Sequence, residues 1–325
     1  MNTYRHGTVH LHAVLFNYED GGQTAPGRYD FTKLCAAFAE VGSGADAPAI
    51  IGINEAKEWF LWGDAPALEA AEALSDTLHR AYDIRVLPSM GGRLPSAILF
   101  DSSRLALRFW GQAQETVYPS RRGLTRFGMR GTGAEFQVHI DQWAYYDGAT
   151  RLSTAKQVDN YGGDAVPTLL MGDYNGTASG PHLPERDWRI APRHKVHHKG
   201  IQGPGGAWGP DTQALDHLLG EWAGLPGDPE PGILRAAGTR FEALPEIAHF
   251  DQDMTPERAF LPTVNDNIDS GGGLLIDWML INEAWLKRGG LVPDTYRVHV
   301  PPGTHRADYP SDHRLVEAVL WLPVT

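Results

Sequence analysis

The chain has 325 residues, of which 42% are hydrophobic and 21% are charged, and this composition excludes a disordered or fibrous protein. A chain of this length can bury a large core. It carries 28 basic and 40 acidic residues, so its formal net charge of −12 excludes a general electrostatic attraction to nucleic acid or to an anionic membrane. Binding to either would need a local basic patch or a bound metal.

The single cysteine, Cys35, cannot form an internal disulfide and lies in an amphipathic pattern that predicts a buried apolar role. Residues 1–20 lack the basic start and apolar core of a signal peptide. No run approaches the roughly 20 apolar residues of a membrane span. We therefore expect a cytoplasmic protein without a membrane span, and nothing in the sequence predicts a protein partner.

Strands and helices alternate in the first quarter of the chain. The predicted elements here are strands over 8–16 and 49–53 and helices over 31–41 and 65–82. Alternation along the first strand places four residues on one face: Leu11, Ala13, Leu15 and Asn17. Asp30 and Asp64 precede the two helices as candidate N-caps.

Strands and turns dominate from residue 84 onward. The predicted strands are 84–87, 96–100, 105–110, 135–140, 168–171, 274–281 and 315–322, and the predicted helices are 151–160 and 211–222. Two stretches, 176–210 and 223–273, read as long loops, which in compact domains are usually functional or mobile. The pattern predicts a single α+β domain over 1–325, a four-layered α/β sandwich. Two mostly antiparallel sheets would pack face to face, with helices outside.

Carboxylates follow or interrupt several of the apolar strands, which would place them at one rim of a buried sheet. These acids are Glu55, Asp173, Asp277 and Asp312. A buried carboxylate without a partner costs several kcal/mol, so such acids need a cation or a hydrogen-bond donor. A group of acids with few basic neighbours suits Mg²⁺, Mn²⁺ or Ca²⁺. We therefore expect a site for a hard divalent cation.

Amides and imidazoles occur in the same pattern. Asn17 and Asn175 are neutral groups that can hold phosphoryl oxygens, and His139 and His313 are candidate proton carriers or phosphate contacts. A histidine held by an aspartate has one ring nitrogen fixed, so the other can exchange a proton with water. The combination suits a metal ion and a phosphate ester. Each motif taken alone also fits a turn or a helix cap.

Taken together, these residues resemble the endonuclease/exonuclease/phosphatase superfamily, the DNase I-like metal-dependent phosphoesterases. The resemblance runs from Asn17 to His313, nearly the whole chain. The matching positions are Asn17 at the end of the first strand, Glu55 as the metal-binding glutamate, His139 as the mid-chain histidine, the turn Gly172-Asp173-Tyr174-Asn175, Asp277 on an Ile-Asp strand, and the closing Ser311-Asp312-His313. The chain departs from the family where Asn54 replaces a glutamine and Tyr174 a phenylalanine. The Tyr-x-Pro-Asn segment of the exonuclease III branch is absent.

The resemblance implies roles for these residues. Glu55, with Asp312 or Asn17, would hold Mg²⁺ or Mn²⁺, with Ca²⁺ as a further possibility. Asp277 would orient His313, which activates or positions water. Asn175 and His139 would stabilise charge on the phosphoryl group, and Asp173 would orient water or the leaving group. Whether His313 or Asp173 is the general base stays open at this point.

Two basic clusters could contact a polyanionic substrate. One follows the Asp173 turn and comprises Arg186, Arg189, Arg193, His194, Lys195, His197, His198 and Lys199, with Arg193 and Lys195 as candidate substrate-binding residues. The other comprises Arg121, Arg122, Arg126 and Arg130. Either cluster could instead be a solvated loop. Trp143 and Trp208 are candidates to stack on a base or another ring of the substrate.

The sequence thus predicts a metal-dependent hydrolase of phosphate esters, with a phosphodiesterase or nuclease as the first hypothesis because His139 and both basic clusters fit a phosphodiester backbone. The second hypothesis is a phosphatase or phosphodiesterase for a small molecule or lipid headgroup, which the net charge of −12 favours. The third is a binding module that has lost turnover.

Overall fold

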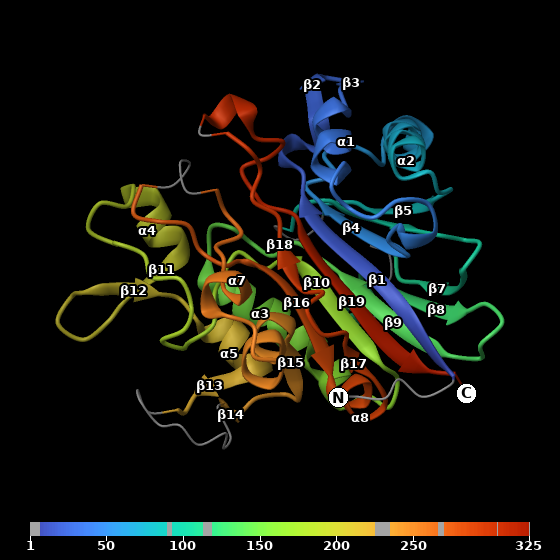
Figure 1. The fold of residues 1–325 in the computed structure, drawn as a ribbon. Coiled ribbons are helices and arrows are strands. Elements are labelled where there is room, and N and C mark those ends of the chain that lie inside the picture. The colour runs from blue at the N-terminus through green and yellow to red at the C-terminus, as the bar shows by residue number, and fades with distance from the viewer. Residues whose placement is uncertain are drawn as a thin grey trace.

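Two large β-sheets pack face to face with helices on their outer sides, as the computed structural model in Figure 1 shows. The structure describes residues 7–89, 93–112, 119–224, 235–265, 270–303 and 305–324. Both sheets are mostly antiparallel, so the predicted α/β sandwich is confirmed. None of the described helices is long and apolar enough to cross a membrane.

The first sheet has β1 and β4 at its centre. Its path runs through β17 (Gly290–Leu291), β19 (Val316–Pro323), β1 (Thr8–Asn17), β4 (Ile50–Asn54), β6 (Ser96–Phe100) and β5 (Asp83–Leu87), and β18 (Arg297–Val298) also pairs with β19. Only β1 and β4 pair in parallel, and their register sets Asn17 beside Asn54. The last residues of these two strands therefore lie at the same rim.

The second sheet likewise combines one parallel pair of strands with antiparallel pairs. Its order is β15 (Phe241–Ala243), β16 (Asp277–Asn282), β10 (Thr168–Asp173), β9 (Glu135–Ile140), β8 (Leu124–Met129) and β7 (Leu105–Trp110). Here β9 and β10 form the parallel pair. Antiparallel pairing of β10 with β16 sets Asp173 beside Asp277, so the end of one strand meets the start of the other.

The helices lie outside the sheets. They are α1 (Thr32–Phe38), α2 (Ala65–Leu78), α3 (Gly148–Val158), α4 (Arg193–Lys199), α5 (Gln213–Leu219), α6 (Leu244–Glu246), α7 (Pro256–Ala259) and α8 (Glu283–Arg288). Three small two-stranded sheets pair β2 (Gln23–Ala25) with β3 (Arg28–Tyr29), β11 (Gly200–Gln202) with β12 (Trp208–Pro210), and β13 (Gly220–Trp222) with β14 (Arg235–Ala237). In Figure 1, α4, β11 and β12 project beside the second sheet.

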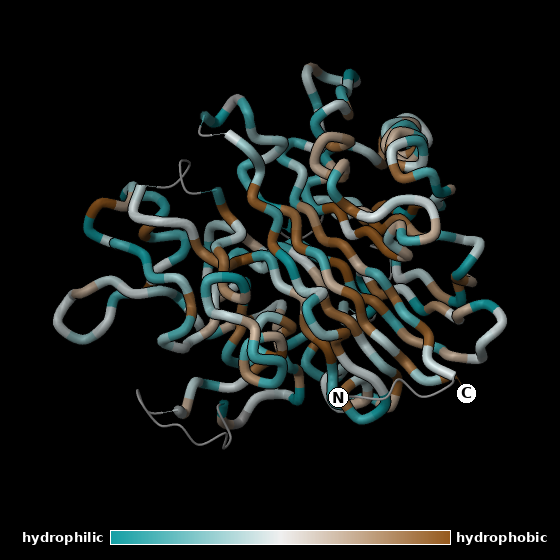
Figure 2. The backbone as a smooth tube through the Cα atoms, in the orientation of Figure 1, coloured by the Kyte–Doolittle hydropathy of each residue, from teal (hydrophilic) through white to brown (hydrophobic). Residues whose placement is uncertain are grey.

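Alternation along the strands builds the core. Leu11, Ala13 and Leu15 of β1 belong to the large apolar cluster between the sheets, as predicted, whereas Val14 and Phe16 pack under α1 and α2. Figure 2 shows these strands as adjacent hydrophobic bands with hydrophilic connections at their ends. At Gly52 of β4 the sheets are so close that a Cβ atom would lie 2.7 Å from Cε of Met171.

The structure extends or corrects several predicted elements. The strand β8 was not predicted, because Gly128 and Arg126 weaken its apolar pattern. The predicted helix over 211–222 ends at Leu219, since Gly220 has φ of 95° and Trp222 already belongs to β13. The stretch 176–210 contains α4, β11 and β12, and the described part of 223–273 contains β14, β15, α6 and α7. These short elements have too little periodicity to be predicted.

Candidate active site

The candidate site lies at the rim where the ends of the central strands of both sheets meet. β1 contributes Asn17, β4 leads into Glu55, and β10 and β16 contribute Asp173 and Asp277. The loop before β19 adds Ser311, Asp312 and His313. The predicted rim acids are therefore brought together from both sheets.

Asn54 joins the two sheets beneath the site. Its Nδ2 donates to Oγ of Ser96 at 2.9 Å and to the carbonyl of Asp141 at 3.1 Å. Its Oδ1 accepts from the backbone N–H of Asp173 at 2.8 Å. All three bonds are buried. The Asn54 side chain therefore fixes the position of the Asp173 backbone relative to β4, the strand that leads into Glu55.

Asn17 lies against the acids that follow it in the chain. Its Nδ2 donates to Oδ2 of Asp173 at 3.1 Å and approaches Oε1 of Glu55 at 3.4 Å. Its Oδ1 is buried, and no described residue forms a hydrogen bond with it. Glu55 itself has φ of 58°, a left-handed turn that directs its side chain back across the rim, where its Oε2 accepts from the N–H of Asp20 at 3.2 Å.

Gln142, which the sequence reasoning did not identify, contacts this cluster directly. Its Nε2 donates to Oε1 of Glu55 at 3.2 Å and to Oδ2 of Asp173 at 3.1 Å, and its Oε1 accepts from the N–H of Glu55 at 3.0 Å. Gln142 follows Val138 and Ile140 at a spacing of two, so it continues the core-facing side of β9. This spacing of two from buried residues of β9 is the sequence signal that could have identified Gln142.

His139 lies on the opposite face of β9. Its ring is buried beside Tyr161, with the ring centroids 6.3 Å apart. Burial and the guanidinium groups of Arg93 and Arg122 lower the pKa of His139 to about 4, although Asp141 opposes this, so the ring is neutral. The sequence predicted that His139 lies in the site. In the structure it is Gln142, not His139, that contacts Glu55 and Asp173.

Asp277 and His313 form a buried pair. Nδ1 of His313 donates to Oδ2 of Asp277 at 2.7 Å. Burial lowers the pKa of His313, but the Asp277 and Asp312 carboxylates outweigh it and raise the pKa to about 10. Ser311 holds this segment to β1, because its Oγ donates to the carbonyl of Asn17 at 2.7 Å. The pairing agrees with the predicted orienting role of Asp277.

Asn175 lies at the turn after β10 with φ of 52°. Its Nδ2 donates to Oδ2 of Asp173 at 2.9 Å and to the carbonyl of Trp143 at 3.1 Å. Its Oδ1 accepts from Nζ of Lys199, which also donates to the carbonyl of Asn175 at 3.3 Å. Lys199 is thus the member of the first basic cluster that the structure brings to the rim.

The acids at the rim fit a divalent cation. Burial raises the pKa of both Glu55 and Asp173, although the neighbouring His313 opposes the rise. Oδ1 of Asn17 and Oδ1 of Asp277 are buried without a hydrogen-bond partner in the part of the chain that the structure describes. Donor atoms of Asp173, Asp277 and His313 lie within 4.8 Å of one another. Glu55 and Asn17 lie beside this trio, since Nδ2 of Asn17 contacts both Glu55 and Asp173.

Most arginines of the two basic clusters are engaged elsewhere. Arg122 is buried and pairs with Asp141. Arg130 donates to the carbonyl of Ser102 at 2.8 Å, and Arg189 pairs with Asp187 at 2.7 Å. The guanidinium of Arg186 lies 5.1 Å from the ring centre of Trp188. The clusters therefore do not form one continuous basic track.

The remaining predicted substrate contacts lie on or near α4. Arg193 is exposed at its start, and Lys195 is partly buried one turn before Lys199. Trp143 is buried and stacks on Tyr174 with ring centroids 4.1 Å apart, so its faces are covered on that side. Trp208 is partly exposed on β12, beside His197.

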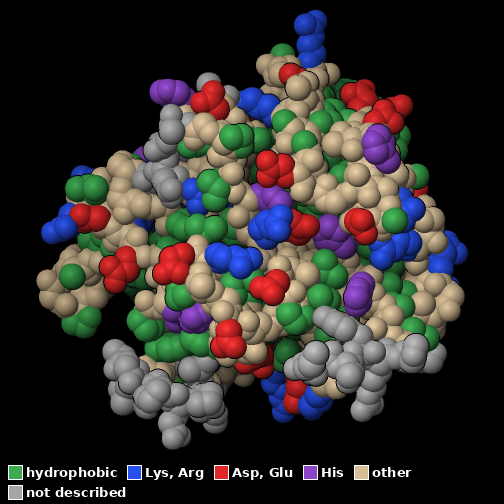
Figure 3. All heavy atoms as spheres, viewed as in Figure 1, with side chains coloured by type: hydrophobic (Ala, Val, Ile, Leu, Met, Phe, Trp, Pro, Cys, Tyr) green, Lys and Arg blue, Asp and Glu red, His purple; other side chains and the backbone are tan. Residues whose placement is uncertain are grey.

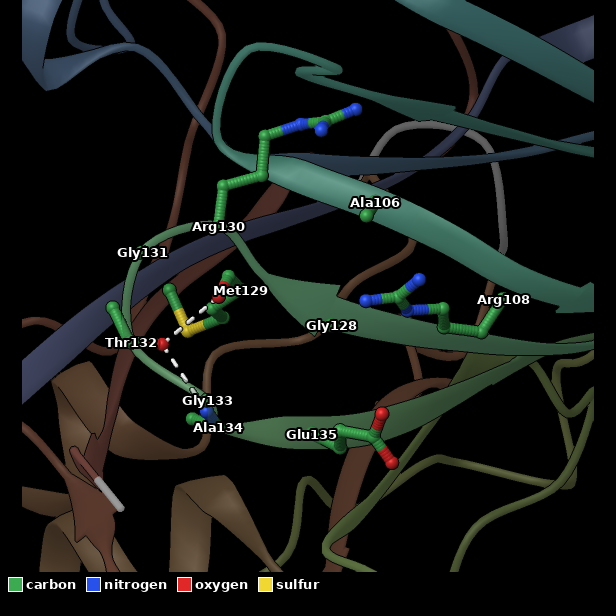
Figure 4. Close-up of a pocket in the computed structure, with 10 residues that line it drawn as sticks. All are labelled: Ala106, Arg108, Gly128, Met129, Arg130, Gly131, Thr132, Gly133, Ala134 and Glu135. Atoms are coloured by element: carbon green, nitrogen blue, oxygen red, sulfur yellow. Dashed lines mark hydrogen bonds between the residues drawn. The ribbon is translucent and has the colours of Figure 1, made fainter.

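The described hollows do not coincide with the acids. One of about 430 Å³ lies at the turn between β8 and β9, where Figure 4 shows Arg108 and Glu135 at its side. Another of about 720 Å³ lies between residues 185–189 and 206–208. Figure 3 shows acidic and basic side chains interspersed over the visible face. The hydrogen-bonded chemistry of the rim, rather than a hollow, therefore identifies the site.

No protein-family profile matches the sequence, and no curated protein matches it. Solved structures with a similar fold do exist. An endonuclease/exonuclease/phosphatase family protein from Bacteroides thetaiotaomicron is 14% identical over 98% of this chain and 99% of its own, with a TM-score of 0.55. A mannosyl-6-phosphatase from Bacteroides thetaiotaomicron VPI-5482 is 13% identical over 95% and 99%, with a TM-score of 0.52.

A third similar structure is ANGEL2, described as a 2',3'-cyclic phosphatase. It is 12% identical over 97% of this chain and 96% of its own, with a TM-score of 0.53. At such low identity these likenesses concern the fold alone, and they span nearly the full length of each chain. The chain therefore has the fold of the endonuclease/exonuclease/phosphatase proteins.

Proposed function

We propose that this protein is a metal-dependent hydrolase of phosphate esters. The observation that carries the proposal is the rim cluster, in which two buried oxygens, Oδ1 of Asn17 and Oδ1 of Asp277, have no hydrogen-bond partner among the described residues. Such oxygens need a cation or a proton donor. His313, which is hydrogen-bonded to Asp277, and the neighbouring acids are groups that can donate or accept a proton during the reaction.

Glu55, Asp312 and Asn17 would hold the cation, with Mg²⁺ or Mn²⁺ as the ions that suit oxygen ligands of this kind. When bound, the ion would neutralise charge on the phosphoryl group and lower the pKa of a bound water. The acids themselves need this charge compensation, since burial raises the pKa of Glu55 and of Asp173. Asp312 contributes to the electrostatic field at both Glu55 and His313.

The roles of the other residues follow from their contacts. Asp277 fixes Nδ1 of His313, which leaves Nε2 for the substrate or for water. Asp173 accepts from Asn17, Gln142 and Asn175, so its carboxylate is held in one orientation. Between the two candidate bases, we favour Asp173 for water, because three amides hold its Oδ2, and His313, which Asp277 holds through Nδ1, as the proton donor.

Within this class, the geometry favours a small phosphate ester over a long nucleic acid. Arg122, Arg186 and Arg189 are engaged with protein groups, and the chain has a net charge of −12. A nucleic acid held through its backbone would need several free cations along one path. A nuclease remains the second candidate, since Arg193 and Trp208 are accessible beside α4 and β12.

The experiment that tests the proposal compares hydrolysis of bis-p-nitrophenyl phosphate and p-nitrophenyl phosphate with Mg²⁺, with Mn²⁺ and with EDTA, alongside a plasmid-nicking gel. Metal-dependent cleavage of either ester is expected, with Asp277→Asn lowering turnover by orders of magnitude at an unchanged melting temperature. Cleavage of the plasmid would shift the substrate class to nucleic acid. Cleavage that persists in EDTA or in Asp277→Asn would contradict the proposed site.

A further inference from the structure

Lys199 reaches the rim from a segment that is separate from the strands bearing the acids. It is the last residue of α4, and its Nζ donates to both Oδ1 and the carbonyl oxygen of Asn175. Burial lowers the pKa of Lys199 to about 8, and the carboxylates of Asp173 and Asp277 oppose this. The ammonium group therefore lies within the electrostatic field of the candidate site.

Two of the amides at the rim, Asn175 and Gln142, have already used their N–H groups. An amide has two donor protons. Those of Asn175 go to Asp173 and to the carbonyl of Trp143, and those of Gln142 go to Glu55 and Asp173. In this arrangement neither amide has a proton left for an anionic substrate. An ammonium group has three donors, and the two bonds from Lys199 to Asn175 leave one for another acceptor.

The fold holds Lys199 in this position. The carbonyl of Lys199 accepts from the N–H of Asp211 at 2.9 Å. Arg151 of α3 is 1% exposed and donates to the carbonyl of His198 at 2.9 Å while it pairs with Asp211 at 2.9 Å. The C-terminal end of α4 is thereby held to α3 by the bond from Arg151 to the carbonyl of His198, and to Asp211 by the bond to the carbonyl of Lys199.

We propose that Lys199 contacts the substrate phosphate and supplies the positively charged hydrogen-bond donor that the engaged amides of Asn175 and Gln142 do not. The inference rests on the proposed function, because it assigns a residue to the same site. A cationic donor fixed beside a phosphoryl group stabilises the negative charge that grows there during the reaction. Asn175 then acts as a positioning residue, whose Oδ1 aims the ammonium group.

The test measures binding of inorganic phosphate by calorimetry, with and without Mg²⁺, together with steady-state hydrolysis of the ester that the wild-type protein cleaves. The variants are Lys199→Met, which keeps the aliphatic stem, and Lys199→Arg, which keeps the charge. Lys199→Gln replaces the methionine variant if the latter melts early. Lys156→Met, on the exposed side of α3, is the matched control for loss of one positive charge.

We expect Lys199→Met to weaken phosphate binding by about tenfold or more, the loss expected for one charge-assisted hydrogen bond. Lys199→Arg should keep most of the affinity, and Lys156→Met should bind phosphate as the wild type does. Phosphate affinity unchanged in both Lys199→Met and Lys199→Gln would overturn the inference and leave Lys199 as a structural partner of Asn175.

The outcome for Lys199 can be separated from that for the proposed function. Phosphate binding that depends on Lys199, in a protein that cleaves none of the esters, would support the phosphate contact and contradict the hydrolase. Ester cleavage with phosphate affinity and KM unaffected by Lys199→Met would support the hydrolase and contradict the phosphate contact of Lys199. A folded wild-type protein that neither binds phosphate nor cleaves an ester would overturn both.

Discussion

Gln142 donates to Glu55 and Asp173, and its own carbonyl oxygen accepts from the N–H of Glu55. This amide therefore fixes both carboxylates while carrying no charge of its own. His139, three residues earlier, is buried on the other face of β9 with its pKa lowered to about 4, chiefly by burial. At the scale of single residues, strand parity thus decides which of these side chains meets the site.

We expect Gln142→Ala to lower kcat by about 10²-fold, because it frees two carboxylates that one amide now orients. His139→Leu should leave kcat nearly unchanged, because the neutral ring makes no hydrogen bond to the rim acids in the described structure. Steady-state kinetics of both variants, with thermal melting as the check on folding, would decide this. The opposite order of effects would return His139 to the site.

Glu55 offers a second prediction at this scale. If Glu55 holds the cation, Glu55→Gln removes one negative ligand and weakens metal affinity, so activity should fall at low Mg²⁺ and recover in part at high Mg²⁺. A titration of activity against Mg²⁺ for wild type and variant measures the shift. A variant equally inactive at every Mg²⁺ concentration would show that Glu55 has another role.

At the scale of elements, strand pairing is reinforced by side chains that cross between neighbours. Glu317 of β19 accepts from Nε2 of His12 on β1 at 2.8 Å and from Nε2 of His299, after β18, at 2.5 Å. Although burial opposes ionisation, the hydrogen bonds from these two histidines lower the pKa of Glu317 from 4.5 to about 2. The carboxylate therefore joins β1, β19 and the segment after β18.

Because the pKa of Glu317 is lower in the folded state than in the unfolded state, its ionisation adds to the free energy of unfolding. This contribution is fully present above pH 4.5 and is lost as the pH falls toward about 2. Glu317→Gln removes this titration. We therefore expect the variant to be less stable than the wild type at pH 6 to 7, by roughly 1 kcal/mol or less given the partial exposure of the pair. The difference should shrink below pH 4.5. Denaturant unfolding across this pH range measures it, and a constant difference would contradict the assignment.

At the scale of the whole molecule, charge bears on the class of substrate. The net charge is −12, and acidic and basic side chains are interspersed over the face in Figure 3. Backbone binding of nucleic acid through several phosphates would cost roughly 10³-fold in affinity between about 50 and 200 mM salt. A small ester held by one metal and Lys199 makes far fewer such contacts.

We therefore expect kcat/KM for the cleaved substrate to change only severalfold over that salt range. The measurement is a salt titration of kcat/KM at constant Mg²⁺, with sodium chloride replaced by sodium acetate to separate general screening from specific anion competition. A loss of several orders of magnitude would favour a polyanionic substrate and the nuclease hypothesis.

The sequence by itself determined the sandwich and most of the rim acids. Each acid directly follows or begins an apolar strand, and strands of this kind must be buried, so their polar ends emerge at an edge. Asn17, Glu55, Asp173, Asp277 and His313 were predicted for this reason and lie together in the structure.

Only the tertiary structure decided where Gln142, His139 and Lys199 lie relative to the rim acids. His139 lies on β9 and Gln142 follows its end at an odd spacing, so their faces depend on which side of β9 packs against the other sheet. Lys199 reaches Asn175 because Arg151 of α3 and the N–H of Asp211 both bond to carbonyl groups at the end of α4. Contacts between segments so distant in the chain leave no periodic signal in the sequence, because they depend on how separate elements pack.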